Sequence, residues 1–229
     1  MRILTVDTST QYTFLALCDF NQKWNINKLL CVKTDRRKDN WLELLIHEFC
    51  DSFPLNNLDG FAAGYGPGSF TGLRINFTYL KTLAILWDKL FLTFSTSRFF
   101  HSLFCKIDEA LLVQTNRTLY FSCDPDQDDK ADNIRSLAEW TNHYSQLKDN
   151  LLKTENALVT HKKIKIWNQY PQLENSKEKT APEFDPQSMV TQDIVAIDMP
   201  DPDFILKNKK ELMNSMPFYG HDLVASRKL

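Results

Sequence analysis

An α/β fold with a mixed sheet in residues 1–99 is the fold class that this sequence of 229 residues predicts. Three short apolar runs, at 3–6, 14–18 and 24–32, are typical of the strands of a β-meander. Helical and extended patterns then alternate as far as residue 99, which is the arrangement of α/β proteins. Hydrophobic residues make up 43% of the chain, enough for a packed core, and this excludes a disordered protein.

The segments before residue 60 are a polar turn and a helix. The turn Asp7-Thr8-Ser9-Thr10 joins the first two expected strands, and its side chains can bond their own backbone and close a hairpin. The helix is expected from residue 39 or 40 to 53. One side of it gathers the apolar residues Trp41, Leu42, Leu45, Ile46, Phe49 and Phe53.

A glycine-rich loop follows a short buried strand expected at 60–63. Five of the six glycines of the chain fall between Gly60 and Gly72, where they allow backbone conformations closed to other residues. A P-loop would need lysine and then serine or threonine after the last glycine, whereas Leu73 and Arg74 follow Gly72. We therefore expect a rigid turn that seats the next helix, built from Gly64, Gly66, Pro67, Gly68, Ser69 and Gly72.

That helix is expected over 71–90, with Ser69 or Thr71 as its N-cap. One apolar stripe suits the core of the chain and consists of Leu73, Phe77, Leu80, Ala84 and Trp87. A second stripe lies about 120° round the helix and consists of Ile75, Tyr79, Leu83, Leu86 and Leu90. The remaining face carries Arg74, Thr78, Lys81, Asp88 and Lys89. Two apolar stripes indicate a helix buried within one domain or one shared with a partner.

The second half gives a weaker pattern. A strand at 91–94 and a helix capped by the run Ser95-Thr96-Ser97 lead to a domain boundary near residue 100, so we expect an N-terminal lobe at 1–99 and a divergent second lobe at 100–229. Strands are expected at 111–113, 119–121 and 193–197, and helices at 133–152 and 208–216. Residues 171–189 are polar, contain three prolines and suit a long loop.

Motifs of the common enzyme classes are missing from the sequence, which has no Gly-x-Ser-x-Gly elbow and no His-Glu-x-x-His. The five cysteines are scattered, so we expect no metal site, no cofactor and a reducing compartment.

The chain starts with a strand rather than a signal peptide, and no run reaches the roughly 18 apolar residues of a membrane span. A cytoplasmic protein is expected. Its net charge of −2 offers no basic surface for nucleic acid.

Two motifs resemble a known family. Residues 66–75 read GPGSFTGLRI and residues 3–16 read ILTVDTSTQYTFLA, and both resemble the TsaB (YeaZ) family over about residues 1–97. The resemblance implies the actin/Hsp70/sugar-kinase (ASKHA) fold with a small, divergent second lobe. Asn40 and Trp41 stand where many members have a histidine, and the His-x-x-x-His metal pair of the TsaD paralogue occurs nowhere in this sequence.

The resemblance implies a non-catalytic scaffold and activating subunit. Such a protein binds the transferase TsaD, which forms N6-threonylcarbamoyladenosine at position 37 of tRNAs reading codons that begin with A. An ATPase, TsaE, joins the complex, and tRNA is contacted only through it. In the family, the helices corresponding to 39–53 and 71–90 pack against the partner. The expected partner-binding residues are Ile75, Tyr79, Leu83, Leu86, Trp41 and Leu45.

Two other functions stay open on the sequence. The first is a nucleotide-binding enzyme of the same superfold, an ATPase or a degenerate glycoprotease-like protein. In the superfold the first turn is a phosphate loop, so Asp7, Thr8 and Ser9, together with the Gly64–Gly72 loop, would contact a nucleotide. The second is a homodimer without another partner, since one surface can serve both kinds of dimer.

Overall fold

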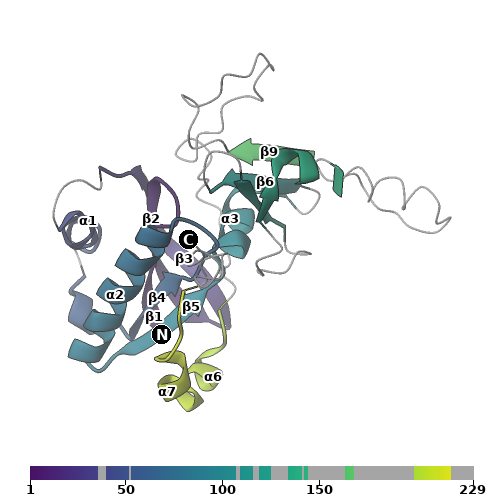
Figure 1. Cartoon of the computed structure of the whole chain (residues 1–229). Coiled ribbons are helices and arrows are strands. Elements are labelled where there is room, and N and C mark those ends of the chain that lie inside the picture. The colour runs from purple at the N-terminus through teal and green to yellow at the C-terminus, as the bar shows by residue number, and fades with distance from the viewer. Residues whose placement is uncertain are drawn as a thin grey trace, which may run out of the picture.

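The structure is a computed structural model, and it describes residues 1–35, 40–51, 53–106, 109–115, 119–124, 134–140, 142–143, 163–167 and 199–217. Figure 1 shows a larger sheet flanked by helices α1 and α2, and a smaller sheet that contains β6 and β9. No helix among these residues is long and apolar enough to cross a membrane.

The larger sheet has five strands in the order β3-β2-β1-β4-β5. Their bounds are Arg2–Asp7 (β1), Tyr12–Asn21 (β2), Lys23–Lys33 (β3), Gly60–Gly64 (β4) and Leu90–Phe94 (β5). The meander β1-β2-β3 is antiparallel, while β4 runs parallel to both β1 and β5. This order and direction confirm the predicted α/β class, the mixed sheet and the strand at 60–63.

Alternate residues of the central strands supply two separate cores, as the period of two along a strand requires. Leu4 and Val6 point to a cluster that includes Phe61 and Phe77, beneath helices α1 (Trp41–Phe49) and α2 (Phe70–Leu86). Ile3, by contrast, faces a second cluster on the other side of the sheet, beneath helix α3 (Thr96–Phe104). Both faces of the sheet are therefore covered.

Helices α1 and α2 both end earlier than their apolar patterns predict. Helix α1 ends at Phe49 rather than at residue 53, and the Phe53 amide donates to the Cys50 carbonyl in a turn, followed by the short 3₁₀ helix η1 (Leu55–Asn57). Helix α2 ends at Leu86, because Asp88, with a φ of 50°, turns the chain into β5. Leu90 lies buried in that strand, so its assignment to the second helical stripe is wrong.

The smaller sheet has four strands in the order β8-β7-β6-β9. They are Glu109–Gln114 (β6), Leu119–Cys123 (β7), Ile134–Ser136 (β8) and Lys163–Trp167 (β9), with β6 parallel to β9. The strands predicted at 111–113 and 119–121 are confirmed. The helix predicted at 133–152 is wrong at its start, since 134–136 pair with β7, and 137–140 are helical. The loop predicted at 171–189 and the strand at 193–197 lie outside the described residues.

One apolar cluster joins the two sheets through α3. It contains Phe14 of β2, Phe99 and Phe100 of α3, Phe121 of β7 and Trp167 of β9, and the rings of Phe14 and Phe100 lie 5.0 Å apart. The helix at the predicted boundary is thus part of a shared core. The division into lobes at residue 100 stays a prediction.

The last described segment packs on the larger sheet. Helix α7 (Lys209–Leu212) confirms only part of the helix predicted at 208–216, and helix α6 (Pro202–Lys207), which was not predicted, precedes it. Trp24 Nε1 donates a hydrogen bond of 2.8 Å to the Pro200 carbonyl, and the Ile205 side chain is fully buried. Lys209 Nζ forms a 2.8 Å ion pair with Asp88 beyond the end of α2.

Candidate functional site

The glycine-rich loop is anchored on the polar turn after β1. The Ser69 amide donates to the Ser9 carbonyl at 2.7 Å, and the Thr8 hydroxyl donates to the Gly72 carbonyl at 2.6 Å. A side chain at Gly68 would overlap Ser9, which explains the glycine there. Ser69 Oγ accepts from the Gly72 amide at 3.3 Å, so Ser69 rather than Thr71 is the N-cap of α2. The loop therefore seats α2 against β1, as expected.

Asp7, Thr8 and Ser9 are almost fully buried and bond within the protein. Asp7 Oδ1 accepts from the Ser9 amide at 2.8 Å and the Ser9 hydroxyl at 2.5 Å. Asp7 Oδ2 accepts from the Thr96 hydroxyl at 2.6 Å, and a side chain at Gly64 would overlap that carboxylate. These contacts use the oxygens that a nucleotide site would turn toward Mg²⁺ or water. The nucleotide-binding role of these residues stays a prediction.

Asn76 fastens the inner face of α2 to the sheet. Its Nδ2 donates to the Val6 carbonyl of β1 at 3.2 Å and to the Gly64 carbonyl of β4 at 3.4 Å. The side chain is fully buried, and its Oδ1 has no hydrogen-bond partner among the described residues. The sequence prediction assigned no role to Asn76. Its helical position beside the core stripe was the available signal.

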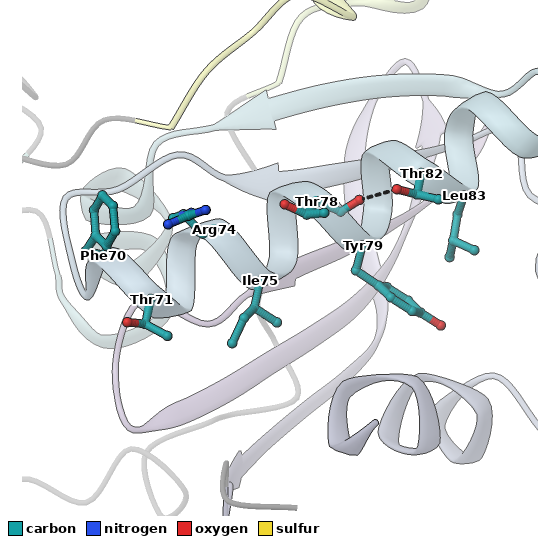
Figure 2. A pocket seen from close by; sticks show the side chains of 8 residues that line it. All are labelled: Phe70, Thr71, Arg74, Ile75, Thr78, Tyr79, Thr82 and Leu83. Carbon is teal, nitrogen blue, oxygen red and sulfur yellow. Dashed lines mark hydrogen bonds between the residues drawn. The ribbon is translucent and has the colours of Figure 1, made fainter. Parts of the chain in front are cut away.

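The outward face of α2 forms an open, mostly apolar groove of about 520 Å³. The first stripe, Leu73, Phe77, Leu80 and Ala84, is buried on the opposite side, as predicted, whereas Trp87 is half-buried. Figure 2 shows the lining residues, with Ile75, Tyr79 and Leu83 pointing toward one flank and Phe70 and Arg74 toward the other. Thr71, Thr78 and Thr82 complete the lining.

Most of the predicted partner-binding residues lie together along α1 and α2. Ile75, Tyr79, Leu83, Trp41 and Leu45 are all half-buried and pack against one cluster. Leu86, the sixth, lies one turn beyond the groove and is 69% exposed. Burial, together with the nearby charge of Glu43 on α1, raises the pKa of the Tyr79 hydroxyl to about 12. The tyrosine hydroxyl therefore stays protonated at neutral pH.

Sequence reasoning assigned only three of the eight described lining residues of this groove to the partner surface. It placed Arg74 and Thr78 on the remaining polar face, offered Thr71 only as an alternative N-cap, and gave no role to Phe70 or Thr82. Viewed down the helix axis, each of these residues lies within about 120° of Ile75 or of a threonine that lines the groove. The helical wheel carried this signal, but the apolar pattern alone did not select these polar residues.

A second depression lies at the far end of α1 and α2. Its lining includes His47, Glu48, Cys50, Asp51 and Trp87. Within the described ranges no three His, Cys, Asp or Glu side chains are grouped to hold a metal ion. Burial raises the pKa of the Cys50 thiol to about 11, so it is not an activated nucleophile.

Comparison with known proteins gives a family match in the part of the chain that contains the groove. Residues 34–101 match the model of the TsaD family, described as tRNA N6-adenosine threonylcarbamoyltransferase. The matched range includes the 66–75 motif and both helices α1 and α2, so the relationship that this motif predicted is confirmed there. It spans less than a third of the chain. A comparison with curated proteins gives no match.

Three solved structures illustrate the matches in fold. They are YeaZ from Pseudomonas aeruginosa, Thermus thermophilus RuvC in complex with a Holliday junction substrate, and the Aquifex aeolicus member of the Ppx/GppA family. Their sequences are 20%, 10% and 11% identical to this chain, with TM-scores of 0.41, 0.34 and 0.32. The alignments cover 53%, 45% and 73% of this chain and 58%, 71% and 66% of those chains. This chain thus spans little more than half of the YeaZ structure.

Proposed function

We propose that this chain is a non-catalytic subunit in the formation of N6-threonylcarbamoyladenosine at position 37 of tRNAs that read codons beginning with A. It acts by binding and activating a TsaD transferase, with a TsaE ATPase joining the complex, and it contacts tRNA only through that complex. The match of residues 34–101 to the TsaD family supports the pathway. Cytoplasmic location follows from the function and stays a prediction.

The observation that carries this proposal is the open apolar face of α2. Ile75, Tyr79 and Leu83 are left half-buried at the edge of the core cluster, next to α1. An apolar surface of this kind on a helix is stabilised by contact with another protein. Tyrosine suits such a surface, since its ring packs in the complex while its hydroxyl is hydrated in the free protein.

A catalytic role finds little support in the chain itself. The histidine pair of TsaD is missing from the sequence, and the described residues contain no group of metal-ligand side chains. The Asp7 carboxylate accepts three hydrogen bonds from protein donors, which favours a structural role over phosphate binding. The nucleotide-binding alternative predicts micromolar ATP binding by the isolated chain that is lost in Asp7→Ala.

The first test is reconstitution of the reaction. The chain is incubated with the TsaD paralogue from the same cells, threonine, bicarbonate, ATP, the threonylcarbamoyl-adenylate synthase and unmodified tRNA. We expect modified adenosine only when both TsaD and this chain are present. Product formed by this chain without TsaD would overturn the non-catalytic proposal.

A second test addresses the surface. The double variant Tyr79→Glu, Leu83→Arg places two charges in the groove, where burial without partners costs several kcal/mol. It should keep its circular dichroism spectrum but lose binding to the TsaD paralogue in calorimetry. Phe204→Glu, Leu206→Arg is the matched control, because it places the same charges on exposed positions of α6. Equal binding by both variants would exclude α2 as the interface.

A further inference from the structure

Arg74 is a charged side chain at the edge of an apolar groove. Of the described residues that line the groove, it is the one that carries a charge. Its guanidinium carbon lies 5.3 Å from the centre of the Phe70 ring, which holds the charge beside the groove. In the part of the chain that the structure describes, no carboxylate lies within ion-pair distance of Arg74.

A partner that covers the groove must neutralise the charge of Arg74 or leave it buried without a counter-ion. Arginine cannot lose its proton in a protein, so covering it removes a full positive charge from water. Burial of an unmatched charge costs several kcal/mol, whereas a carboxylate can accept two parallel hydrogen bonds from the guanidinium. The groove therefore favours an occupant with an acidic side chain opposite Arg74 and disfavours one without it.

The shape of the groove sets the kind of element that fits. Its lining runs from Phe70 to Leu83 along one helix, a length of about 20 Å at 1.5 Å per residue. At about 100° per residue, Thr71, Thr78 and Thr82 fall between the two flanks of the groove, and their small side chains let another backbone approach closely. A helix of three to four turns has a matching length. Ile75 and Leu83 offer it apolar contacts at the α1 flank.

We propose that the groove takes an α-helix of the partner subunit whose apolar stripe packs on Ile75 and Leu83 and whose aspartate or glutamate pairs with Arg74. Arg74 then decides which protein binds, because the same helix without the acidic residue would bury an unmatched guanidinium. This inference rests on the proposed function, since it specifies the chemistry of the TsaD-family helix that the α2 face accepts.

The Tyr79 hydroxyl supplies a second, weaker selection. It lies five residues from Arg74, about 8 Å along the helix axis, and has no hydrogen-bond partner among the residues that the structure describes. A hydrogen-bond acceptor on the docked helix, placed opposite Tyr79, would accept a hydrogen bond from this hydroxyl. The occupant thus needs an acidic group near one end of its contact stripe and an acceptor about five residues away.

The experiment measures binding of the TsaD paralogue by calorimetry to the wild-type chain and to Arg74→Gln, Arg74→Lys and Arg74→Glu. Arg74→Gln should weaken binding by about 30-fold or more. Arg74→Lys should lose less, since it keeps the charge but not the forked geometry. Lys207→Glu, an exposed position on α6, is the charge control and should bind as the wild type does. Each Asp and Glu on the partner's helices is then changed to Arg, and one should restore binding to Arg74→Glu.

The outcomes separate this inference from the proposed function. If the wild-type chain binds the TsaD paralogue and Arg74→Gln binds it with the same affinity, the inference is overturned and the proposed function stands. No wild-type binding would overturn both. A wild-type homodimer that Arg74→Glu dissociates in sedimentation equilibrium would show a second copy as the occupant and overturn the inference. So would weaker tRNA binding by Arg74→Gln, measured by fluorescence anisotropy, with subunit affinity unchanged.

Discussion

Replacing Thr96 by valine removes one hydroxyl from the centre of the structure at nearly constant volume. Thr96 is fully buried at the start of α3, where its hydroxyl donates to Asp7 Oδ2 at 2.6 Å. The Thr96 hydroxyl oxygen also accepts a hydrogen bond from the Gly66 amide at 3.1 Å. The variant therefore breaks a bond to a buried carboxylate and leaves a backbone amide of the glycine-rich loop without its acceptor.

The expected loss of stability follows from these two bonds. A hydrogen bond to a charged group contributes about 1.5–3 kcal/mol and a neutral one about 0.5–1.5 kcal/mol, so Thr96→Val should lose about 2–4 kcal/mol. For a chain of this size that lowers the melting temperature by about 5–15 °C. If Asp7 instead served an open phosphate site, removing the Thr96 hydroxyl would disturb ligand binding more than folding.

Guanidinium chloride titrations measure the free energy of unfolding of Thr96→Val and of a matched control. Thr93→Val is that control, because Thr93 lies half-buried in β5 and forms no hydrogen bond through its hydroxyl with the described residues. Valine suits a strand, so the control should stay within about 0.5 kcal/mol of wild type. Equal unfolding free energies for the two variants would refute the structural reading of Asp7. So would micromolar Mg²⁺-ATP binding that Asp7→Ala abolishes.

Three further predictions test the rest of the fold. The Lys165 ammonium, 2.7 Å away, lowers the pKa of the Glu109 carboxyl, so its stabilisation is full above the ordinary carboxyl pKa of about 4.3 and lost as the pH falls through the lowered value. Denaturant titrations should show that wild type loses more stability than Glu109→Gln between about pH 5 and 3, and equal losses would contradict the pair. Ile205→Ala should lower the free energy of unfolding by about 2–4 kcal/mol, while its exposed neighbour Leu206→Ala should change it by less than about 0.5; similar values would mean that α6 does not pack on the core. Burial raises the pKa of the Cys18 thiol to about 12, so mass spectrometry should find it unmodified by iodoacetamide at pH 8 until the chain unfolds.

Local patterns predicted the parts of the fold that local chemistry decides. The strand at 60–63, the Ser69 and Ser95 caps and the buried stripe of α2 all follow from residue type and period. The end of α2 was missed because the apolar pattern continues to Leu90, and the turn depends on Asp88 in a left-handed conformation. Aspartate tolerates the left-handed conformation, but Asp88 also fits the polar face of the helical pattern, so its residue type alone did not mark the end of the helix.

Long-range contacts were the other limit of sequence reasoning. The Asp7–Thr96 hydrogen bond joins residues 89 positions apart, and no period in the sequence relates them. Residues 134–136 likewise form a strand through pairing with β7, although their own pattern favours a helix. The face of α2 could be predicted because a helix repeats every few residues, whereas the closure of the Asp7 turn depends on α3.

The buried polar turn with the glycine-rich loop holds the outward face of α2 in position. Ser69 caps α2, the Thr8 hydroxyl bonds to the Gly72 carbonyl, and Asn76 ties the helix to β1 and β4. These polar contacts fix the rotation of α2 about its axis, so Ile75 and Leu83 face outward in the free protein as well. A surface already held in its binding orientation loses less conformational entropy on association than a flexible one. The Asp7 turn is closed by bonds within the protein and holds α2 in place, and this closed turn and the open groove together support the proposed protein partner over a nucleotide.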